Sequence, residues 1–164
     1  MIGILRSRLA PLLAMGSISW LCCAGCDLNH ACATVAVHSG AVLTLHLPPA
    51  ADVVAPETVT ACRQPDCVTG TLPPPAPVGM VAQVDVSSVD VRGTMGVAAG
   101  GVRVLQFDWT VRDINPADPR SFYSVDVADA AGTTTGHLAN EVTYVESMPD
   151  GDGCGTVWNA TLSD

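Results

Sequence analysis

The fold is decided by one stretch, Glu57-Thr-Val-Thr-Ala-Cys-Arg-Gln-Pro-Asp-Cys-Val-Thr-Gly-Thr-Leu72. Its two halves are rich in Val and Thr, which favour strands, and they flank a short polar loop that holds Pro65. One antiparallel register gives the pairs Cys62–Cys67, Ala61–Val68, Thr60–Thr69, Val59–Gly70 and Thr58–Thr71. Directly opposed residues approach to about 4.5 Å between Cα atoms, close to disulfide range. We therefore predict a hairpin of strands Glu57–Cys62 and Cys67–Leu72, locked by a Cys62–Cys67 disulfide.

The rest of the chain carries the same kind of signal. Short Val- and Thr-rich runs alternate with Gly, Pro, Asn and Asp, a pattern typical of β-sandwiches and barrels. The further predicted strands are Thr34–His38, Val42–Leu47, Val81–Val86, Val89–Arg92, Val102–Arg112, Phe122–Ala128, Val142–Glu146 and Thr156–Leu162. The proline run at 73–77 is expected to be an extended connection. The sequence thus predicts an all-β domain, an immunoglobulin-like antiparallel β-sandwich of about seven to ten strands.

Two segments alternate clearly between apolar and polar residues. Leu105, Phe107, Trp109 and Val111 point one way, and in the next segment Tyr123, Val125 and Val127 do the same. This period of two puts one face of a strand in the core and the other in water. Because only the turn-rich segment 113–120 separates the two strands, we expect them to pair antiparallel at the centre of the fold.

Composition excludes one class of partner. The chain of 164 residues has seven Arg, no Lys and 16 acidic residues, for a formal net charge of −9. Its length fits one domain. An acidic surface repels phosphate backbones, so we expect no nucleic-acid partner.

The N-terminal segment reads as an export signal. Arg6 and Arg8 precede an apolar run from Leu9 to Leu21, which is shorter than the roughly 20 apolar residues of a membrane-spanning helix. The run ends at Leu21-Cys22-Cys23-Ala24-Gly25-Cys26. Small residues just before a cysteine are typical of a processing site.

This ending resembles the lipobox of bacterial lipoproteins. Ala24 and Gly25 occupy the two small-residue positions before the acceptor Cys26, and Cys23 stands where the family usually has Leu, Val or Ile. The resemblance implies a signal peptide over 1–25, lipid attachment at Cys26, a short tether over 26–31 and the β-sandwich domain over 32–164. The alternative is an ordinary secretory signal cut after Ala33, which would release a soluble, secreted protein.

Cysteine parity favours the lipid attachment. Cleavage before Cys26 removes Cys22 and Cys23 and leaves Cys32, Cys62, Cys67 and Cys154 to pair in an oxidising compartment. With Cys62 and Cys67 joined, we expect Cys32 to pair with Cys154. The long loop so closed would be worth roughly 5 kcal/mol by the chain-entropy estimate, against roughly 2 for the hairpin bridge.

The acidic residues and histidines do not form a recognisable metal or catalytic motif. Asp150-Gly151-Asp152-Gly153 has two acidic residues at alternate positions but lacks the rest of a calcium loop, so an acidic turn is expected. The histidines are His30, His38, His46 and His137, without metal-site spacing, although a hairpin could bring His38 and His46 together. No nucleophile-elbow motif occurs.

The aromatic residues could form a sugar-binding platform. They share strand faces with apolar neighbours, however, so core positions are expected for Trp109, Trp158, Tyr123 and Tyr144.

These patterns favour a non-enzymatic lipoprotein of the cell envelope. We expect no cofactor, a membrane partner through the lipid anchor, and a β domain that binds another envelope protein or has a structural role. The alternative is a surface module that binds a small ligand, a metal or a carbohydrate. A hydrolase with an unrecognised site is a weaker option, which a cluster of His with Asp or Glu would favour.

The anchor is tested by a Cys26→Ser variant. Because several acyl chains give stable membrane attachment, at about 0.8 kcal/mol per buried methylene, loss of the acceptor should shift the protein into the soluble fraction. The measurement compares the share of protein in the membrane and soluble fractions of cells that express the variant or the wild type. Equal membrane retention of the two proteins would show that Cys26 is not the attachment site.

Overall fold

The described residues form an all-β domain. The computed structural model describes residues 38–49, 56–148 and 155–164. These ranges contain ten strands: β1 (Gly40–Leu47), β2 (Thr58–Arg63), β3 (Asp66–Thr71), β4 (Val81–Val86), β5 (Val91–Val97), β6 (Arg103–Thr110), β7 (Arg120–Ala128), β8 (Thr134–Thr143), β9 (Val145–Ser147) and β10 (Val157–Ser163). They join in one sheet of order β8-β7-β2-β3-β4-β5-β6-β1-β10-β9. The predicted all-β class is confirmed.

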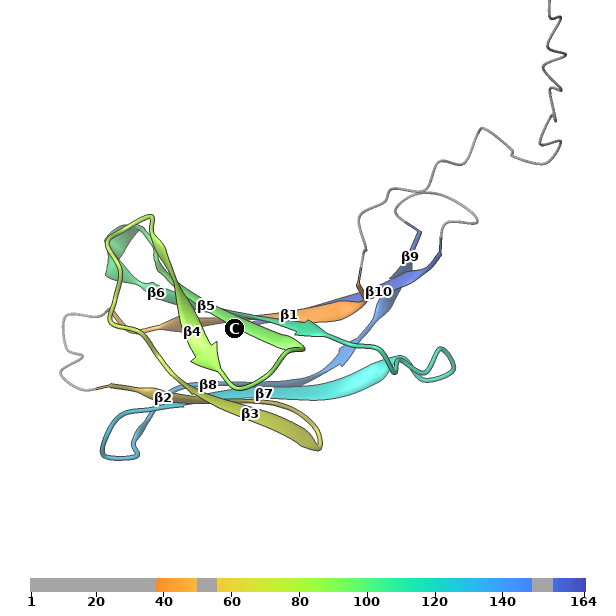
Figure 1. Ribbon diagram of the computed structural model, residues 1–164, viewed down its shortest axis with the longest axis horizontal. Helices are drawn as coiled ribbons and strands as arrows, with labels where there is room; N and C mark the ends of the chain where they lie inside the picture. The colour runs from red at the N-terminus through yellow and green to blue at the C-terminus, as the bar shows by residue number, and fades with distance from the viewer. Residues whose placement is uncertain (1–37, 50–55, 149–154) are drawn as a thin grey trace, which may run out of the picture.

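The sheet folds over on itself into two layers (Figure 1). The first layer contains β8, β7, β2 and β3, and the second contains β4, β5, β6, β1, β10 and β9. The layers are linked at β3–β4, where only Gly70 and Thr71 pair with Val86 and Asp85. At the other side the two end strands, β8 and β9, are joined by the single residue Tyr144. The sheet is therefore nearly closed.

The finer prediction of an immunoglobulin-like antiparallel sandwich is not confirmed. The two layers belong to one hydrogen-bonded sheet rather than to two separate sheets. In addition, β1 and β10 run parallel, with Gly40 opposite Asn159, whereas the other paired strands are antiparallel.

The register predicted for the first hairpin is confirmed. Within β2 and β3, Cys62 pairs with Cys67, Thr60 with Thr69 and Thr58 with Thr71. The pairing extends one step further to Arg63 and Asp66, so the turn is Gln64-Pro65, joined by a cis peptide bond. The two cysteines form a disulfide with their Cα atoms 4.0 Å apart. Sequence, turn and covalent bridge thus specify the same alignment.

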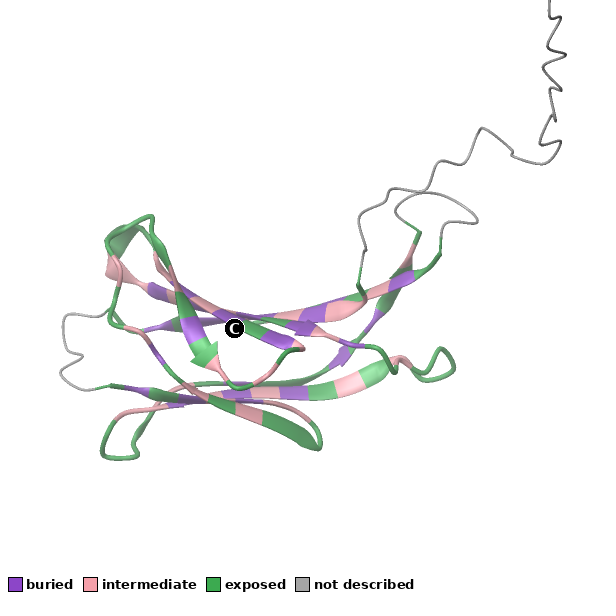
Figure 2. Cartoon of the chain, viewed as in Figure 1, coloured by how far each residue is buried: buried purple, intermediate pink, exposed green. Residues whose placement is uncertain are grey.

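The predicted pairing of the two alternating segments is wrong. Their inward residues are buried as expected, including Phe107, Trp109, Tyr123 and Val125. Buried and more exposed positions alternate along the strands (Figure 2). However, β6 pairs with β1 and β5, whereas β7 pairs with β2 and β8. The two strands face each other across the core, with the rings of Trp109 and Tyr123 edge to face at 5.7 Å between centroids. Alternation identified the buried face but not the neighbouring strand.

Glycines inside strands account for two strands whose extent was mispredicted. A Cβ on Gly136 of β8 would collide with Leu47 of β1, and one on Gly93 of β5 would lie 2.8 Å from the Phe107 ring. These glycines allow close packing between strands and do not mark turns. The predicted strand at 142–146 instead spans the end of β8 (134–143) and the start of β9 (145–147), and β5 covers 91–97 rather than 89–92. The predicted strand at 34–38 lies outside the described residues except for His38, which precedes β1.

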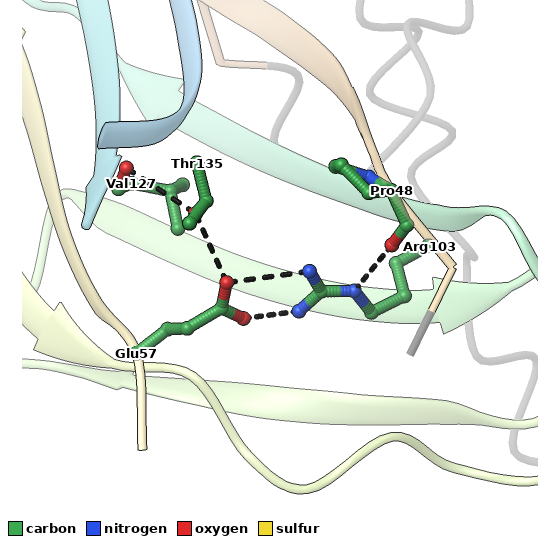
Figure 3. A network of polar contacts seen from close by, with 5 residues as sticks. All are labelled: Pro48, Glu57, Arg103, Val127 and Thr135. Atoms are coloured by element: carbon green, nitrogen blue, oxygen red, sulfur yellow. Dashed lines mark hydrogen bonds and ion pairs between the residues drawn. The ribbon is translucent and has the colours of Figure 1, made fainter. Parts of the chain in front are cut away.

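A buried ion pair connects the two layers (Figure 3). Arg103 at the start of β6 and Glu57 just before β2 are only 2% and 4% exposed. Arg103 donates through both terminal nitrogens to the Glu57 carboxylate, and its Nε donates to the carbonyl of Pro48 at 2.9 Å. The hydroxyl of Thr135 on β8 donates to Glu57 Oε1 at 2.9 Å. The network thus connects the start of β6 with Pro48 after β1, Glu57 before β2 and Thr135 in β8.

Removing one partner of this pair should destabilise the fold strongly. Glu57→Gln leaves the Arg103 guanidinium buried without a counter-charge, which costs about 3–5 kcal/mol of unfolding free energy. The combined Glu57→Leu and Arg103→Met change, which removes both charges, should recover most of that loss. Denaturant unfolding of wild type, Glu57→Gln and the double variant measures the loss and its recovery.

The matched control is Asp90→Asn, which breaks the exposed Arg112–Asp90 pair and should cost about 1 kcal/mol or less. Equal losses of unfolding free energy for Glu57→Gln and Asp90→Asn would contradict the prediction that the buried Glu57–Arg103 pair matters more to stability than an exposed pair.

Candidate functional site

The outer face of the first layer carries a groove lined by hydroxyl groups. In β2 the inward Val59 and Ala61 alternate with the outward Thr58 and Thr60, and β3 adds Thr69 and Thr71 opposite them. We call the resulting hollow of about 490 Å³ the threonine groove. Its lining residues are Thr58, Val59, Thr60, Thr69, Gly70, Thr71, Asp85 and Ser87. The paired threonines were predicted from sequence, but the contribution of Asp85 and Ser87 depends on the β3–β4 crossing, which was not.

Gly70 is essential to the shape of the groove. A Cβ at this position would collide with the Asp85 carbonyl and lie 2.8 Å from the Val86 side chain. The missing side chain lets β4 approach β3 and brings Asp85 and Ser87 to the rim of the groove. A local sequence requirement, a glycine opposite Val59, therefore shapes the site.

A polar row extends from the groove across the first layer. Thr69, Thr60, Asp126 and His137 are successive cross-strand neighbours on β3, β2, β7 and β8. His137 Nδ1 lies 2.6 Å from Asp126 Oδ1, and both side chains are about half exposed. Sequence patterns did not indicate this pair, because the strand segment that holds His137 was not predicted.

The order of this row does not suit a nucleophile activated by histidine. Asp126 stands between His137 and Thr60, which places the imidazole about two strand spacings, roughly 9–10 Å, from the hydroxyl. Nucleophilic catalysis requires the base within hydrogen-bond reach of the nucleophile. The His–Asp pair alone therefore does not make the threonine groove a hydrolase site.

The structure does not bring His38 and His46 together. His38 precedes β1, whereas His46 is near its far end, and β1 separates them along its length. His46 instead contacts Asp164, whose Oδ1 accepts from the His46 backbone N–H at 3.1 Å and lies 2.8 Å from Nδ1. Among the described residues, no group of three or more His, Cys, Asp or Glu side chains is placed to hold a metal ion.

The aromatic side chains lie in the core rather than on a platform. Trp109, Tyr123 and Tyr144 are buried, and Trp158 is half-buried and packed against the core. The hydroxyls of Tyr123 and Tyr144 hydrogen-bond each other inside the fold. Burial and this contact raise the pKa of Tyr123 far above its usual value, so its phenol stays neutral. These buried rings are not available to stack on a sugar.

Several predicted sites lie outside the described residues. They are the lipid-attachment residue Cys26, the cysteines Cys32 and Cys154 and the acidic turn at 150–153. Within the described ranges, no helix is long and apolar enough to cross a bilayer. Comparisons with known proteins add no relative: no protein-family model, curated protein or solved structure matches the chain.

The contact between His46 and Asp164 predicts a pH effect on stability. Partial burial raises the pKa of Asp164, but hydrogen bonds from His46 outweigh this and hold that pKa below its usual value. A carboxyl with a lowered folded pKa stabilises the fold above its unfolded pKa, near 3.9, and loses this contribution as pH falls through the folded pKa. Asp164→Asn should therefore lower the unfolding free energy at pH 7, by about 1 kcal/mol or less because the side chain is partly exposed. The loss is measured by denaturant unfolding.

The difference between wild type and Asp164→Asn should shrink as pH falls below about 4. Glu146→Gln, which removes an exposed carboxylate on β9, serves as the control for one lost negative charge. A difference that stays constant between pH 7 and pH 2 would show that ionised Asp164 is not the stabilising species.

Proposed function

We propose that the protein is an exported, lipid-anchored and non-enzymatic domain of the cell envelope that holds a partner protein at its threonine groove. The observation that carries the proposal is the groove itself. Its hydroxyl groups can donate and accept hydrogen bonds, but none has a histidine base beside it in the row that leads to His137. Such a surface suits recognition rather than chemistry.

The free edge of β3 supports a protein as the ligand. Pairing between β3 and β4 is limited to Gly70 and Thr71, so within the described chain residues 66–69 have a strand partner only on the β2 side. Unpaired backbone N–H and C=O groups along such an edge can bind an extended segment of another protein. The adjacent threonines would then contact alternate side chains of that segment.

Compartment and charge are consistent with this role. The lipobox-like ending at Cys26 provides an anchor, and removal of Arg6 and Arg8 with the signal changes the net charge from −9 to −9 − 2 = −11. A disulfide between Cys62 and Cys67 suits an oxidising compartment and holds the strands of the groove in register. A partner with a basic or neutral surface would be favoured over an acidic one.

Site-specific photocrosslinking in intact envelopes tests the groove. Amine-reactive crosslinkers are unsuitable because the chain has no Lys, so a photoreactive residue is placed at Thr69 in the groove. The control position is Thr161, which is exposed on β10 in the other layer. We expect one discrete adduct from Thr69, none from Thr161, and loss of the Thr69 adduct when Thr58→Arg fills the groove.

Other outcomes would contradict the proposal. Equal adducts at Thr69 and Thr161 would show nonspecific proximity, and an adduct that survives Thr58→Arg would place the partner elsewhere. Saturable micromolar binding of calcium, copper, zinc or cell-wall glycans in calorimetry would favour the alternative, a small-ligand module.

A further inference from the structure

Two segments at one end of the domain are uncharged and apolar. They are residues 73–82, which hold the proline run and the start of β4, and residues 96–102, which connect β5 to β6. These two segments lie side by side, since Val81 pairs with Gly96 and the Gly79 N–H donates to the Val97 carbonyl at 3.1 Å. We call them the apolar tip. No charged residue occurs in either segment of a chain whose net charge is −9.

The apolar tip exposes large side chains. Val78, Met80 and Val81 are 66%, 60% and 66% exposed. Neighbouring exposed residues on the second segment are small, at Ala98, Ala99 and Gly100. Contiguous exposed apolar surface of this kind marks a contact site for protein or membrane.

The backbone of the apolar tip is suited to an apolar medium. Four prolines, at positions 73, 74, 75 and 77, have no N–H to leave unsatisfied. Several remaining donors are satisfied internally: Gly79 to Val97, Met80 to Pro77, Ala98 to Val102 and Gly101 to Ala98. Because an unsatisfied N–H is costly in hydrocarbon, this backbone enters a membrane interface more readily than an ordinary loop does.

The apolar tip can reach the same membrane that holds the proposed anchor. Leu47 at the end of β1 pairs with Arg103 beside the tip, whereas Gly40 at its start is at the opposite end of the domain (Figure 1). The strand between them spans about 23 Å. The 40 − 26 = 14 residues from Cys26 to Gly40 can reach up to about 46–50 Å, enough for the domain to turn its tip toward the bilayer.

We propose that the apolar tip docks on the lipid bilayer, inserting Val78, Met80 and Val81 into its interface. That the domain lies close to a membrane rests on the anchor at Cys26 in the proposed function. The insertion itself depends only on the residues of the apolar tip. The acidic domain has no basic patch at the tip, so zwitterionic lipid is favoured and anionic lipid is not. The tether keeps the tip near the bilayer, which makes even a weak apolar contact effective.

Quenching of an introduced tryptophan by brominated lipid tests the insertion. The full chain is reconstituted in vesicles of brominated phosphatidylcholine, where its apolar N-terminal segment holds it whether or not Cys26 carries lipid. Met80→Trp reports on the tip. Val89→Trp reports on the turn at the other end of the β4–β5 hairpin, where Val89 is 91% exposed. The parent chain gives the background from its native tryptophans.

We expect strong extra quenching for Met80→Trp and none for Val89→Trp. The added changes Val78→Asp and Val81→Asp should reduce the Met80→Trp quenching about tenfold, because an aspartate is costly in the membrane interior. Anionic phosphatidylglycerol in the vesicles should weaken the quenching at low salt, and high salt should restore it.

Three results would overturn the proposal. Quenching at Val89→Trp without quenching at Met80→Trp would mean that the domain stands with its tip away from the membrane. No extra quenching at either position would mean that the domain does not touch the bilayer. A concentration-dependent blue shift of Met80→Trp without vesicles, abolished by Val78→Asp, would mean that a second copy covers the tip. None of these results depends on the crosslinking at the threonine groove, so the two proposals fail separately.

Discussion

A sheet that is apolar on only one face must cover that face, and this requirement governs the whole fold. Each long strand places its apolar side chains on one side, and a flat sheet of ten such strands would leave that side in water. The sheet folds at the short β3–β4 link and returns at Tyr144, so that the two layers bury each other's apolar faces. The contact of Trp109 with Tyr123 and the ion pair of Glu57 with Arg103 both form inside the space so created.

The hairpin could be predicted from sequence because several local constraints agree on one register. The cysteines, the threonine pairs and the turn around Pro65 all specify the same alignment over 57–72, without information from the rest of the chain. The partners of β6 and β7 could not be predicted in this way. Their alternation specifies which face is buried, and this pattern is the same whether the two strands pair in a sheet or face each other across a core.

Other features depend on contacts between distant residues. Gly136 and Gly93 look like strand breakers in sequence, but they allow packing against Leu47 and Phe107. Glu57 and Arg103 are 46 positions apart, and no local pattern relates them. The threonine groove could be predicted only in part. Its hydroxyl pairs follow from the hairpin, whereas Asp85 lines the groove only because β4 crosses at Gly70.

The threonine groove and the apolar tip are mechanically linked. The chain leaves the groove at Thr71, forms the first segment of the tip and returns to the groove at Asp85. The ladder between β3 and β4 ends at Thr71, because the next N–H, that of Leu72, donates to the Glu57 carbonyl at 2.9 Å instead. The proline run that follows has few N–H groups to pair and forms the first segment of the uncharged tip. Because β3 and β4 connect the groove to the tip, and β4 is paired with β5, a tip held at the bilayer would hold the groove at a fixed height above it. An acidic domain attached only through the anchor would otherwise have no preferred orientation, so the apolar tip would determine which face a partner meets.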